Sequence, residues 1–408
     1  MDTTFQHDAV RTLTDLRDHL ARHDKPIAFF FGAGTSCSIW IPTIGDPATS
    51  EPLIPAVAGL TRICHEEVVK LGATFESAWK LIVEYCEARG QDPNIETILS
   101  RVRMMLNAVG DADILAGLGR PAIEQLEECI RKTIAKIVSP DLSRVPSDAA
   151  HHKLASWIGK SSRRMPVEIF TVNYDVLFEY ALENARIPSF DGFVGSHQPF
   201  FHSDSVRRKE AAPGPTWTRL WKMHGSVNWQ KLSVGGRTRV IRGPLDGEGE
   251  MIFPSYQKYD ESRQQPYSAY MDRLTRFLEQ DDALLIAAGF SFSDEHLNNL
   301  VFTALDNKPR THVYSLQFDE LPKESDLFKQ ASSRSNLIVL GPKSGIIGGK
   351  HAAWKAEAPQ PFMSGVFGLE DEEIDDGGSK KTIQVGKMKV GNFSIFCEFL
   401  SGMETREN

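Results

Sequence analysis

Residues able to bind an anion and to accept a proton follow four apolar runs of the sequence. IAFFF is followed by GAGTS at 32–36, where glycines would let a phosphate approach the backbone. EIFTV is followed by NYD at 173–175, and RLWKM by HGS at 224–226. LLIAA is followed by GFS at 289–291. Because histidine can accept a proton near neutral pH, the four segments combine a candidate phosphate cradle with a candidate general base.

The apolar runs that precede these segments are typical of strands buried in a parallel sheet. Strands are predicted at 27–31, 167–172, 218–223, 283–290, 311–318 and 336–340. Helical segments such as DVLFEYALENA and DEHLNNLVFTALD separate several of them. This alternation predicts an α/β fold with a largely parallel sheet and helices on both faces. In such a sheet the ligand lies outside the carboxyl ends of the strands, where the four segments fall.

The sequence around the first strand has three distinct parts. An amphipathic helix is predicted at 8–23, before the strand. The proline-rich stretch 41–55 predicts a long loop over the site, because prolines interrupt regular elements. From 56 to about 160 the apolar spacing is almost wholly helical, which predicts a helical insertion module.

The C-terminal part is expected to form a small separate unit. A hairpin is predicted to turn at Gly235 and Gly236, still within the main domain. The acidic run 369–378 is typical of a solvated linker, and the sequence after it is typical of a small β appendage. We therefore expect one domain at 1–345, containing the insertion, and a linker with a β-rich appendage at 346–408.

The composition indicates a globular protein, with 41% hydrophobic and 25% charged residues. No run approaches the roughly 18 to 20 apolar residues of a membrane span, and the first residues lack a signal-peptide pattern. We therefore expect a cytoplasmic protein without a membrane partner. The formal net charge of −8 argues against direct nucleic-acid binding. The five cysteines are scattered without a C-x-x-C pair, which favours neither a disulfide framework nor a zinc ribbon.

Each polar segment also has a purely structural interpretation. Thr35 and Ser36 could cap a helix, and Asn173 and Asp175 could form a turn or a helix cap. His224 could simply be a hydrogen-bonded residue of the fold. The ordinary dinucleotide fingerprint would need a third glycine and an acidic residue roughly 20 positions further on, where this sequence has its proline-rich stretch. A standard hydride-transfer domain is therefore disfavoured.

In their order and placement, GAGTS, TVNYD, HGS and GFS resemble the motifs of the sirtuin-like family, the silent information regulator homologues. The resemblance covers roughly residues 26–320, with the helical insertion where the family carries a smaller variable module. PNIETILS and GFSFSDEHLNN are similar to the bacterial antiphage-defence branch, whose members hydrolyse NAD during phage infection. The resemblance implies a Rossmann-like fold and NAD as the substrate.

The resemblance also implies roles for individual residues. It places Asn173 beside the nicotinamide ribose and the attacking water, His224 as the general base, and Asp175 at the carboxamide. The remaining residues that it assigns to the dinucleotide follow the strands at 27–31 and 283–290: Gly32, Ala33, Gly34, Thr35, Ser36, Gly289, Phe290 and Ser291. Cleavage of the nicotinamide–ribose bond develops oxocarbenium character, so it needs tight ribose positioning and a proton acceptor, tasks that suit asparagine and histidine.

The sequence departs from the protein-deacylating sirtuins in a respect that bears on the substrate. Those proteins carry two cysteine pairs after the catalytic histidine, forming a zinc-bound lobe that frames the acyl-lysine groove. Here no cysteine lies between Gly225 and Asp282. We therefore expect no zinc, and we predict that water attacks the ribose, which gives nicotinamide and ADP-ribose.

An uncontrolled NAD hydrolase would kill its own host, so we expect a homo-oligomer whose activity depends on a partner or ligand. The chain length resembles that of sirtuin-like subunits encoded beside a HerA-type hexameric ATPase, and another defence-system partner is the alternative. Two other functions remain open at this point. One is a non-catalytic subunit that senses NAD or ADP-ribose, and the other, less favoured, is an NAD-dependent protein deacylase.

Overall fold

The computed structural model describes residues 5–43, 46–160, 162–245, 265–376 and 379–403, and its centre is a nine-stranded sheet. The strands are β1 (Ile27–Phe31), β6 (Glu168–Thr171), β7 (Ser189–Phe190), β10 (Thr218–Lys222), β13 (Leu284–Ala288), β14 (His312–Leu316), β15 (Leu337–Leu340), β16 (Ser344–Ile347) and β17 (Lys350–Ala353). They lie in the order β17-β16-β15-β14-β13-β1-β6-β10-β7. Strands β7 to β15 in this order pair in parallel, whereas β16 and β17 are antiparallel additions at one edge. The predicted α/β architecture with a largely parallel sheet is confirmed.

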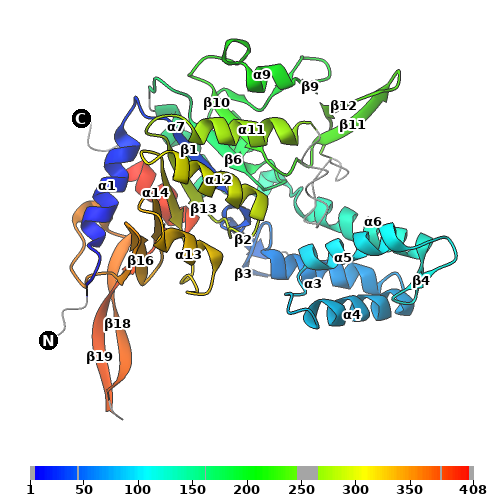
Figure 1. The fold of residues 1–408 in the computed structure, drawn as a ribbon, viewed down its shortest axis with the longest axis horizontal. Helices are drawn as coiled ribbons and strands as arrows, with labels where there is room; N and C mark the ends of the chain where they lie inside the picture. The colour runs from blue at the N-terminus through cyan, green and yellow to red at the C-terminus, as the bar shows by residue number, and fades with distance from the viewer. Residues whose placement is uncertain (1–4, 44–45, 161, 246–264, 377–378, 404–408) are drawn as a thin grey trace.

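Alternate residues of β1 face two different cores. Phe29 and Phe31 pack in one core with side chains of α1 (Ala9–Ala21), α7 (Ala150–Lys160), α8 (Leu177–Asn184) and α14 (Phe393–Gly402). Ala28 and Phe30 pack in the other with α11 (Tyr267–Leu278), α12 (Glu295–Asn307) and α13 (Asp326–Ser332). Both faces of the sheet are therefore covered, as Figure 1 shows, which explains why its strands are apolar throughout.

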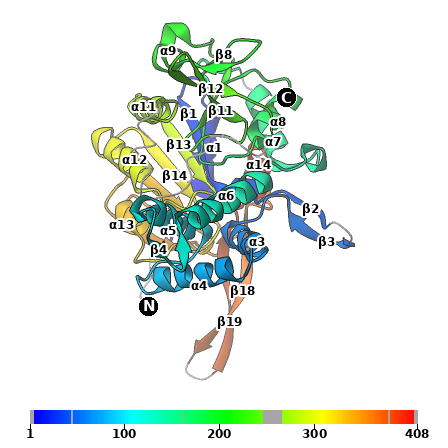
Figure 2. The same cartoon turned by 90° about the vertical axis from the view of Figure 1, so that its right-hand side faces the viewer.

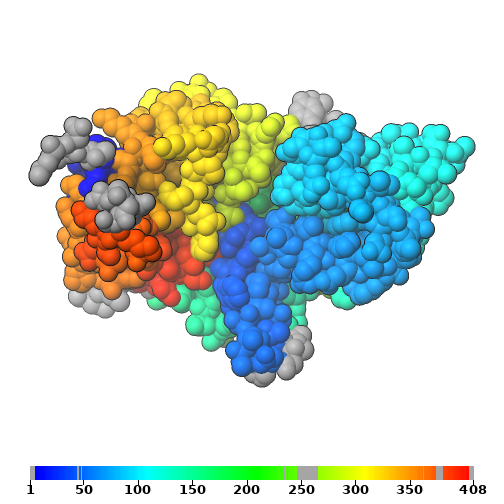
Figure 3. All heavy atoms as spheres, turned by 90° about the horizontal axis from the view of Figure 1, so that it is seen from below, coloured from blue at the N-terminus to red at the C-terminus, as the bar shows by residue number. Residues whose placement is uncertain are grey.

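A third core belongs to a helical module at one side of the molecule. Its helices are α3 (Val57–Val69), α4 (Ala73–Glu87), α5 (Ile95–Ala108) and α6 (Arg120–Ile137), with a small hairpin of β4 (Ile114–Leu115) and β5 (Leu118–Gly119). Figure 3 shows this module beside the sheet domain, seen from below. The predicted insertion is thus present but shorter than expected. Helix α7, which we placed inside it, contributes Leu154 and Trp157 to the sheet's own core.

The proline-rich stretch 41–55 does not form the expected long loop. It contributes to a hairpin of β2 (Trp40–Thr43) and β3 (Asp46–Pro52), which projects from the sheet domain in Figure 2. Its prolines are compatible with the hairpin because a two-stranded sheet leaves half of the backbone N–H groups unpaired. Ile39, Ile41 and Leu53 are buried against the helical module, so the hairpin is anchored at its base.

The expected unit at 346–408 contains the predicted β-rich part, in the hairpin of β18 and β19, but the prediction is wrong in three respects. The boundary at 345 falls inside β16, a strand of the main sheet. The acidic run lies in β18 (Phe367–Asp376), which pairs along its whole length with β19 (Ser379–Met388) in the hairpin at the lower left of Figure 1. Cross-strand ion pairs such as Glu370 with Lys387 offset the acidic charges, so the run can be a strand. The last segment is a buried helix, α14, rather than a β element.

Smaller elements complete the described chain. They are α2 (Ala33–Ser36), η1 (Leu142–Arg144), β8 (Phe193–Val194), β9 (Phe200–Phe201), α9 (Ser203–Arg207), η2 (Lys209–Ala211), β11 (Trp229–Val234), β12 (Arg237–Arg242) and η3 (Pro361–Met363). Strands β11 and β12 form the predicted hairpin, with Gly235 and Gly236 at φ 59° and 76° in the turn. Among the described residues, no helix is both long enough and apolar enough to cross a membrane.

The position of α14 leads to a testable prediction about stability. Phe396 is 0% exposed, and its ring centroid lies 6.2 Å from that of Phe29 in β1. Phe396→Ala should lower the free energy of unfolding by about 3–5 kcal/mol in urea denaturation, because it removes a large ring from a closed core. The exposed pair of Lys380 and Glu373 provides a control, and Lys380→Ala should change stability by less than about 1 kcal/mol. Equal effects of the two substitutions would show that α14 is a peripheral appendage.

Candidate active site

The fold brings the polar segments after four strands to one edge of the sheet. Strands β13, β1, β6 and β10 are consecutive neighbours and run parallel, so their carboxyl ends lie together. Asn173, His224 and Gly289 each follow one of these ends, as does the turn at 32–36. The predicted site residues therefore share one edge, although they are distant in the chain.

Asn173 is held at this edge by its amide nitrogen. Nδ2 donates to the carbonyl oxygen of Gly32 at 3.0 Å, to Thr35 Oγ1 at 3.0 Å and to Ser36 Oγ at 2.8 Å. The Gly32 carbonyl can only accept, so it fixes which end of the amide faces the turn. With Nδ2 engaged in this way, Oδ1 is the atom that Asn173 can offer to a ligand hydroxyl or a water.

The hydroxyls of Thr35 and Ser36 connect the turn after β1 to the loop after β6. Both residues are buried. Thr35 Oγ1 donates to the Gly32 carbonyl at 2.9 Å, and Ser36 Oγ donates to Asp175 Oδ2 at 2.6 Å. Neither acts as the side-chain cap of α2, whose N-cap residue is Gly32. These hydroxyls position Asn173 and Asp175.

Asp175 has protein partners on both carboxylate oxygens. Oδ2 accepts from Ser36, and Oδ1 accepts from the backbone N–H of Leu177 at 3.1 Å, where α8 begins. The side chain is buried. These contacts are those of a turn residue at a helix start, the structural interpretation that the sequence left open. Contact between Asp175 and a carboxamide stays a prediction.

His224 is paired with a carboxylate that the sequence did not single out. Its Nε2 lies 3.1 Å from Asp294 Oδ2, and both side chains are buried. Asp294 is the N-cap of α12, and its Oδ1 accepts from the N–H groups of His296 and Leu297. An aspartate before a helical pattern is recognisable as a cap, but that signal does not show that its second oxygen reaches a histidine 70 positions earlier.

The glycines at the edge allow a close backbone contact that the sequence did not predict. A Cβ on Gly32 would stand 2.5 Å from the carbonyl oxygen of Gly289, and one on Gly34 would stand 2.7 Å from the Gly289 Cα. The N–H groups of Gly32 and Gly34 donate to Ala288 and Gly289 carbonyls, and that of Thr35 donates to the Gly32 carbonyl. The glycines thus allow two backbone turns to touch. Binding of the dinucleotide's phosphates by residues 32–36 stays a prediction.

Of the residues after β13, Phe290 packs beside the core and Ser291 is exposed. The ring of Phe290 lies 4.6 Å from that of Phe30 and 4.8 Å from that of Phe292, so it packs beside the core. Ser291 is exposed, and its hydroxyl lies 2.9 Å from that of Ser293. Gly289 has φ 61°, a conformation that favours glycine. Ala33 is exposed at the same edge.

The glycine contact leads to a second stability prediction. Gly34→Ala should destabilise the protein by about 1–3 kcal/mol, because the new methyl group would overlap the backbone of Gly289. Gly214 is a matched control, since a Cβ there meets no atom within 4 Å. Gly214→Ala should change the free energy of unfolding by less than about 0.5 kcal/mol. Urea denaturation of both variants checks the prediction, and a neutral Gly34→Ala would contradict the close packing of the two turns.

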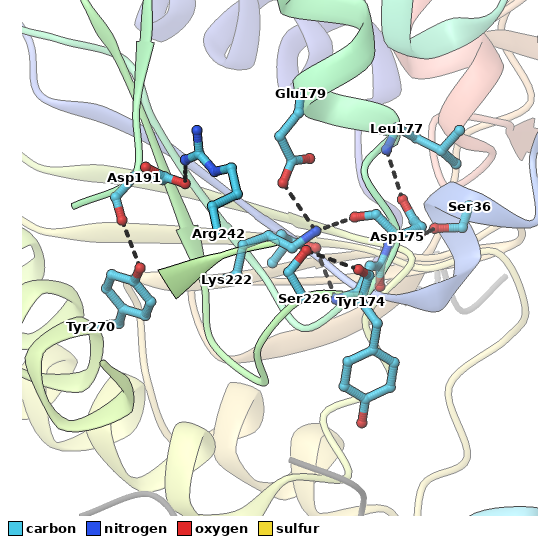
Figure 4. A network of polar contacts seen from close by, with 12 residues as sticks. Ser36, Tyr174, Asp175, Leu177, Glu179, Asp191, Lys222, Ser226, Arg242 and Tyr270 are labelled. Atoms are coloured by element: carbon cyan, nitrogen blue, oxygen red, sulfur yellow. Dashed lines mark hydrogen bonds and ion pairs between the residues drawn. The ribbon is translucent and has the colours of Figure 1, made fainter. Parts of the chain in front are cut away.

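A buried lysine joins the strand that carries His224 to the loop that carries Asn173 and Asp175. Lys222 is 1% exposed, and its Nζ donates to the carbonyl oxygen of Asp175 and lies 3.3 Å from Glu179 Oε1 (Figure 4). Burial raises the pKa of Glu179, and the Lys222 charge opposes that rise. The second oxygen of Glu179 is buried without a hydrogen-bond partner among the described residues. This pair could not be predicted from the sequence, because Lys222 lies within an apolar run.

Further hydrogen bonds connect the same two loops. Ser226 Oγ and the Val227 N–H both donate to the carbonyl oxygen of Tyr174, at 3.2 and 3.0 Å. The loop after β6 and the loop after β10 are thus bonded to each other as well as to Lys222. The edge is a connected polar network in which Asn173 and His224 are held by separate partners.

With this geometry in place, the chain can be compared with known proteins. Residues 167–336 match the family model of a SIR2-like domain. The match begins just before β6 and includes Asn173, Lys222, His224 and Asp294. The match supports a sirtuin-like relationship and an NAD-related function for this part of the chain. No curated protein matches the chain. Within the described residues, no group of three or more histidine, cysteine or acidic side chains is arranged to hold a metal ion.

Proposed function

We propose that the protein is an NAD glycohydrolase that cleaves NAD into nicotinamide and ADP-ribose. The observation that carries this proposal is that Asn173 and the His224–Asp294 pair follow neighbouring parallel strands at the same sheet edge, in the part of the chain that matches a SIR2-like domain. An NAD-dependent reaction at this edge needs ribose positioning and a proton acceptor, and these side chains can supply both.

The proposed reaction assigns one task to each of these residues. Asn173 Oδ1 accepts a hydrogen bond from the ribose or from the attacking water, because Nδ2 is held by the turn after β1. The glycosidic C–N bond breaks, and its electron pair leaves with nicotinamide. The water oxygen bonds to the ribose carbon, and His224 takes the proton of that water. Asp294 holds the imidazole ring and stabilises its charged form.

Within the cell, we propose that the enzyme is an effector of antiphage defence that depletes NAD. This role would require a homo-oligomer or a complex that restrains the enzyme until infection, with a HerA-type hexameric ATPase as one candidate partner. The proposal draws on the motif resemblance and on the need to restrain an enzyme that consumes a central cofactor. We further propose that the enzyme acts in the cytoplasm, where NAD is available.

Hydrolysis can be distinguished from deacylation and from binding alone by following oxygen from water. The full chain is incubated with NAD in H₂¹⁸O, alone and with the product of the neighbouring gene, with and without an acetyl-lysine peptide. Hydrolysis predicts ADP-ribose that carries ¹⁸O at the anomeric carbon and forms without peptide. Strict dependence on the peptide would support a deacylase, and bound but uncleaved NAD in every condition would support a sensing subunit.

A further inference from the structure

A second candidate binding site lies at the opposite end of the sheet from Asn173 and His224. A cavity of about 560 Å³ is lined by residues at the end of α7, before β6, after α8 and before β10. Its volume falls within the roughly 300–1,000 Å³ of small-molecule sites. Apolar side chains such as Val167, Ile187 and Pro188 form part of its wall, together with the cationic residues Lys160, Arg163 and Arg186. None of the described residues that line it is acidic.

Arg163 carries a partly buried charge without an acidic partner in the described part of the chain. Its two terminal nitrogens donate to the carbonyl oxygens of Leu20 at 2.7 Å and Arg22 at 3.0 Å. Its Nε is buried with no hydrogen-bond partner among the described residues. Burial alone lowers the pKa of this guanidinium to about 10. The two carbonyl oxygens and the Trp157 ring, whose centroid lies 4.8 Å from Arg163 Cζ, stabilise this charge in part, and an anion in the cavity would supply a full countercharge.

Arg186 occupies a backbone position that usually belongs to glycine. It follows the end of α8 with φ 57°, and the N–H groups of Arg186 and Ile187 donate to Glu183 and Leu182 carbonyls at 2.9 Å. This pattern is a Schellman motif, in which the left-handed residue is most often glycine. Arginine is strained there. Its side chain makes no ion pair with another described residue, whereas Arg310 and Arg334 are paired with Asp282 and Asp306.

We propose that this cavity binds a phosphorylated organic anion of about mononucleotide size. The phosphate would lie against Arg163 and Arg186, because guanidinium groups match phosphate geometry and these two have no acidic partner in the described chain. The apolar wall formed by Val167, Ile187 and Pro188 suits the base or another uncharged part of the ligand. The site is independent of the proposed hydrolase reaction.

AMP and inorganic phosphate are the probes that test this site. Each is titrated into the purified full chain by calorimetry, and melting temperature is measured without ligand. Arg186→Gly should weaken AMP binding by about 10-fold or more, because it removes a charge-assisted contact. It should leave the melting temperature unchanged or raise it, since glycine relieves the left-handed strain. Loss of binding therefore cannot be attributed to unfolding.

A control variant locates the binding event. Arg208→Ala removes an exposed arginine paired with Asp204 elsewhere on the surface and should leave AMP affinity unchanged. Unaltered affinity in Arg186→Gly would overturn the proposal, as would the lack of saturable AMP binding to the unmodified chain. If the chain binds inorganic phosphate but does not bind AMP, the assignment of a ligand with an apolar part is overturned.

Discussion

Replacing His224 by alanine is expected to slow NAD hydrolysis by about 10²- to 10⁴-fold, the usual contribution of a general base. The reason is that the residue accepts the proton of the attacking water in the proposed reaction. Asp294→Asn should also lower the rate, by about 10- to 100-fold, because an uncharged partner stabilises the imidazolium less well. Both effects should appear mainly in kcat, since neither group is assigned to binding the bulk of the dinucleotide.

The control for these variants is another histidine far from the edge. His351 lies on β17, is exposed and has its Nε2 3.0 Å from Ser344 Oγ. The His351→Ala variant should hydrolyse NAD at the same rate as the unmodified protein. A His224→Ala protein that is folded by circular dichroism but hydrolyses NAD at the unmodified rate would remove His224 from the mechanism. An equal loss in His351→Ala would point to a general effect of histidine removal.

Replacing Lys222 by methionine is expected to destabilise the protein by about 3–5 kcal/mol, the usual cost of leaving one partner of a buried ion pair alone. Glu179, whose side chain is 19% exposed, would lose the charge 3.3 Å away, and the Asp175 carbonyl would lose its donor. The carbonyl contact also joins the strand that carries His224 to the loop that carries Asn173, so under the proposed function kcat should fall in the same variant. Urea denaturation and steady-state kinetics measure the two effects.

A double substitution, and the pH dependence of the stability loss, show whether Lys222 stabilises the protein through its ion pair with Glu179 or only through packing. Burial raises the pKa of Glu179, and loss of Lys222 should raise it further. The stability loss in Lys222→Met should therefore be small while Glu179 is protonated, and it should grow as pH rises through that raised pKa. Lys222→Met with Glu179→Gln should recover a large part of the stability at neutral pH. Purely additive effects of the two substitutions would contradict a coupled pair.

Patterns within a few residues were sufficient to predict the sheet and the edge at which the polar segments lie. Each apolar run that ends in a polar turn became a strand of the central sheet, because continuous burial on both faces leaves a clear signal. Parallel pairing of β6 and β10 then explains why Asn173 and His224 lie at the same edge, although 51 positions separate them in the numbering. The local sequence predicts an element correctly where the burial of that element's own residues leaves a pattern in it.

The errors arose where a residue's role depends on a distant partner. The acidic run 369–378 looked solvated, yet lysines on β19 such as Lys387 pair with it and make it a strand. The close contact of Gly32 and Gly34 with the backbone of Gly289 was not predicted, because it joins two segments that are far apart in the chain. Asp294 and Glu179 gave no functional signal, because their partners His224 and Lys222 lie on another element. Such contacts are set by tertiary packing, which a single sequence does not display.

The measurement that tests the central claim most directly is nicotinamide release from NAD by the purified full chain. Release is measured for the full chain alone and together with the product of the neighbouring gene. The Asn173→Ala variant is measured under the same conditions. The proposed function predicts release by the unmodified chain in at least one condition, and a loss of about 10²-fold or more in Asn173→Ala, because ribose and water lose their anchor. NAD that binds but is never cleaved, or equal release by Asn173→Ala, would contradict the proposed hydrolase.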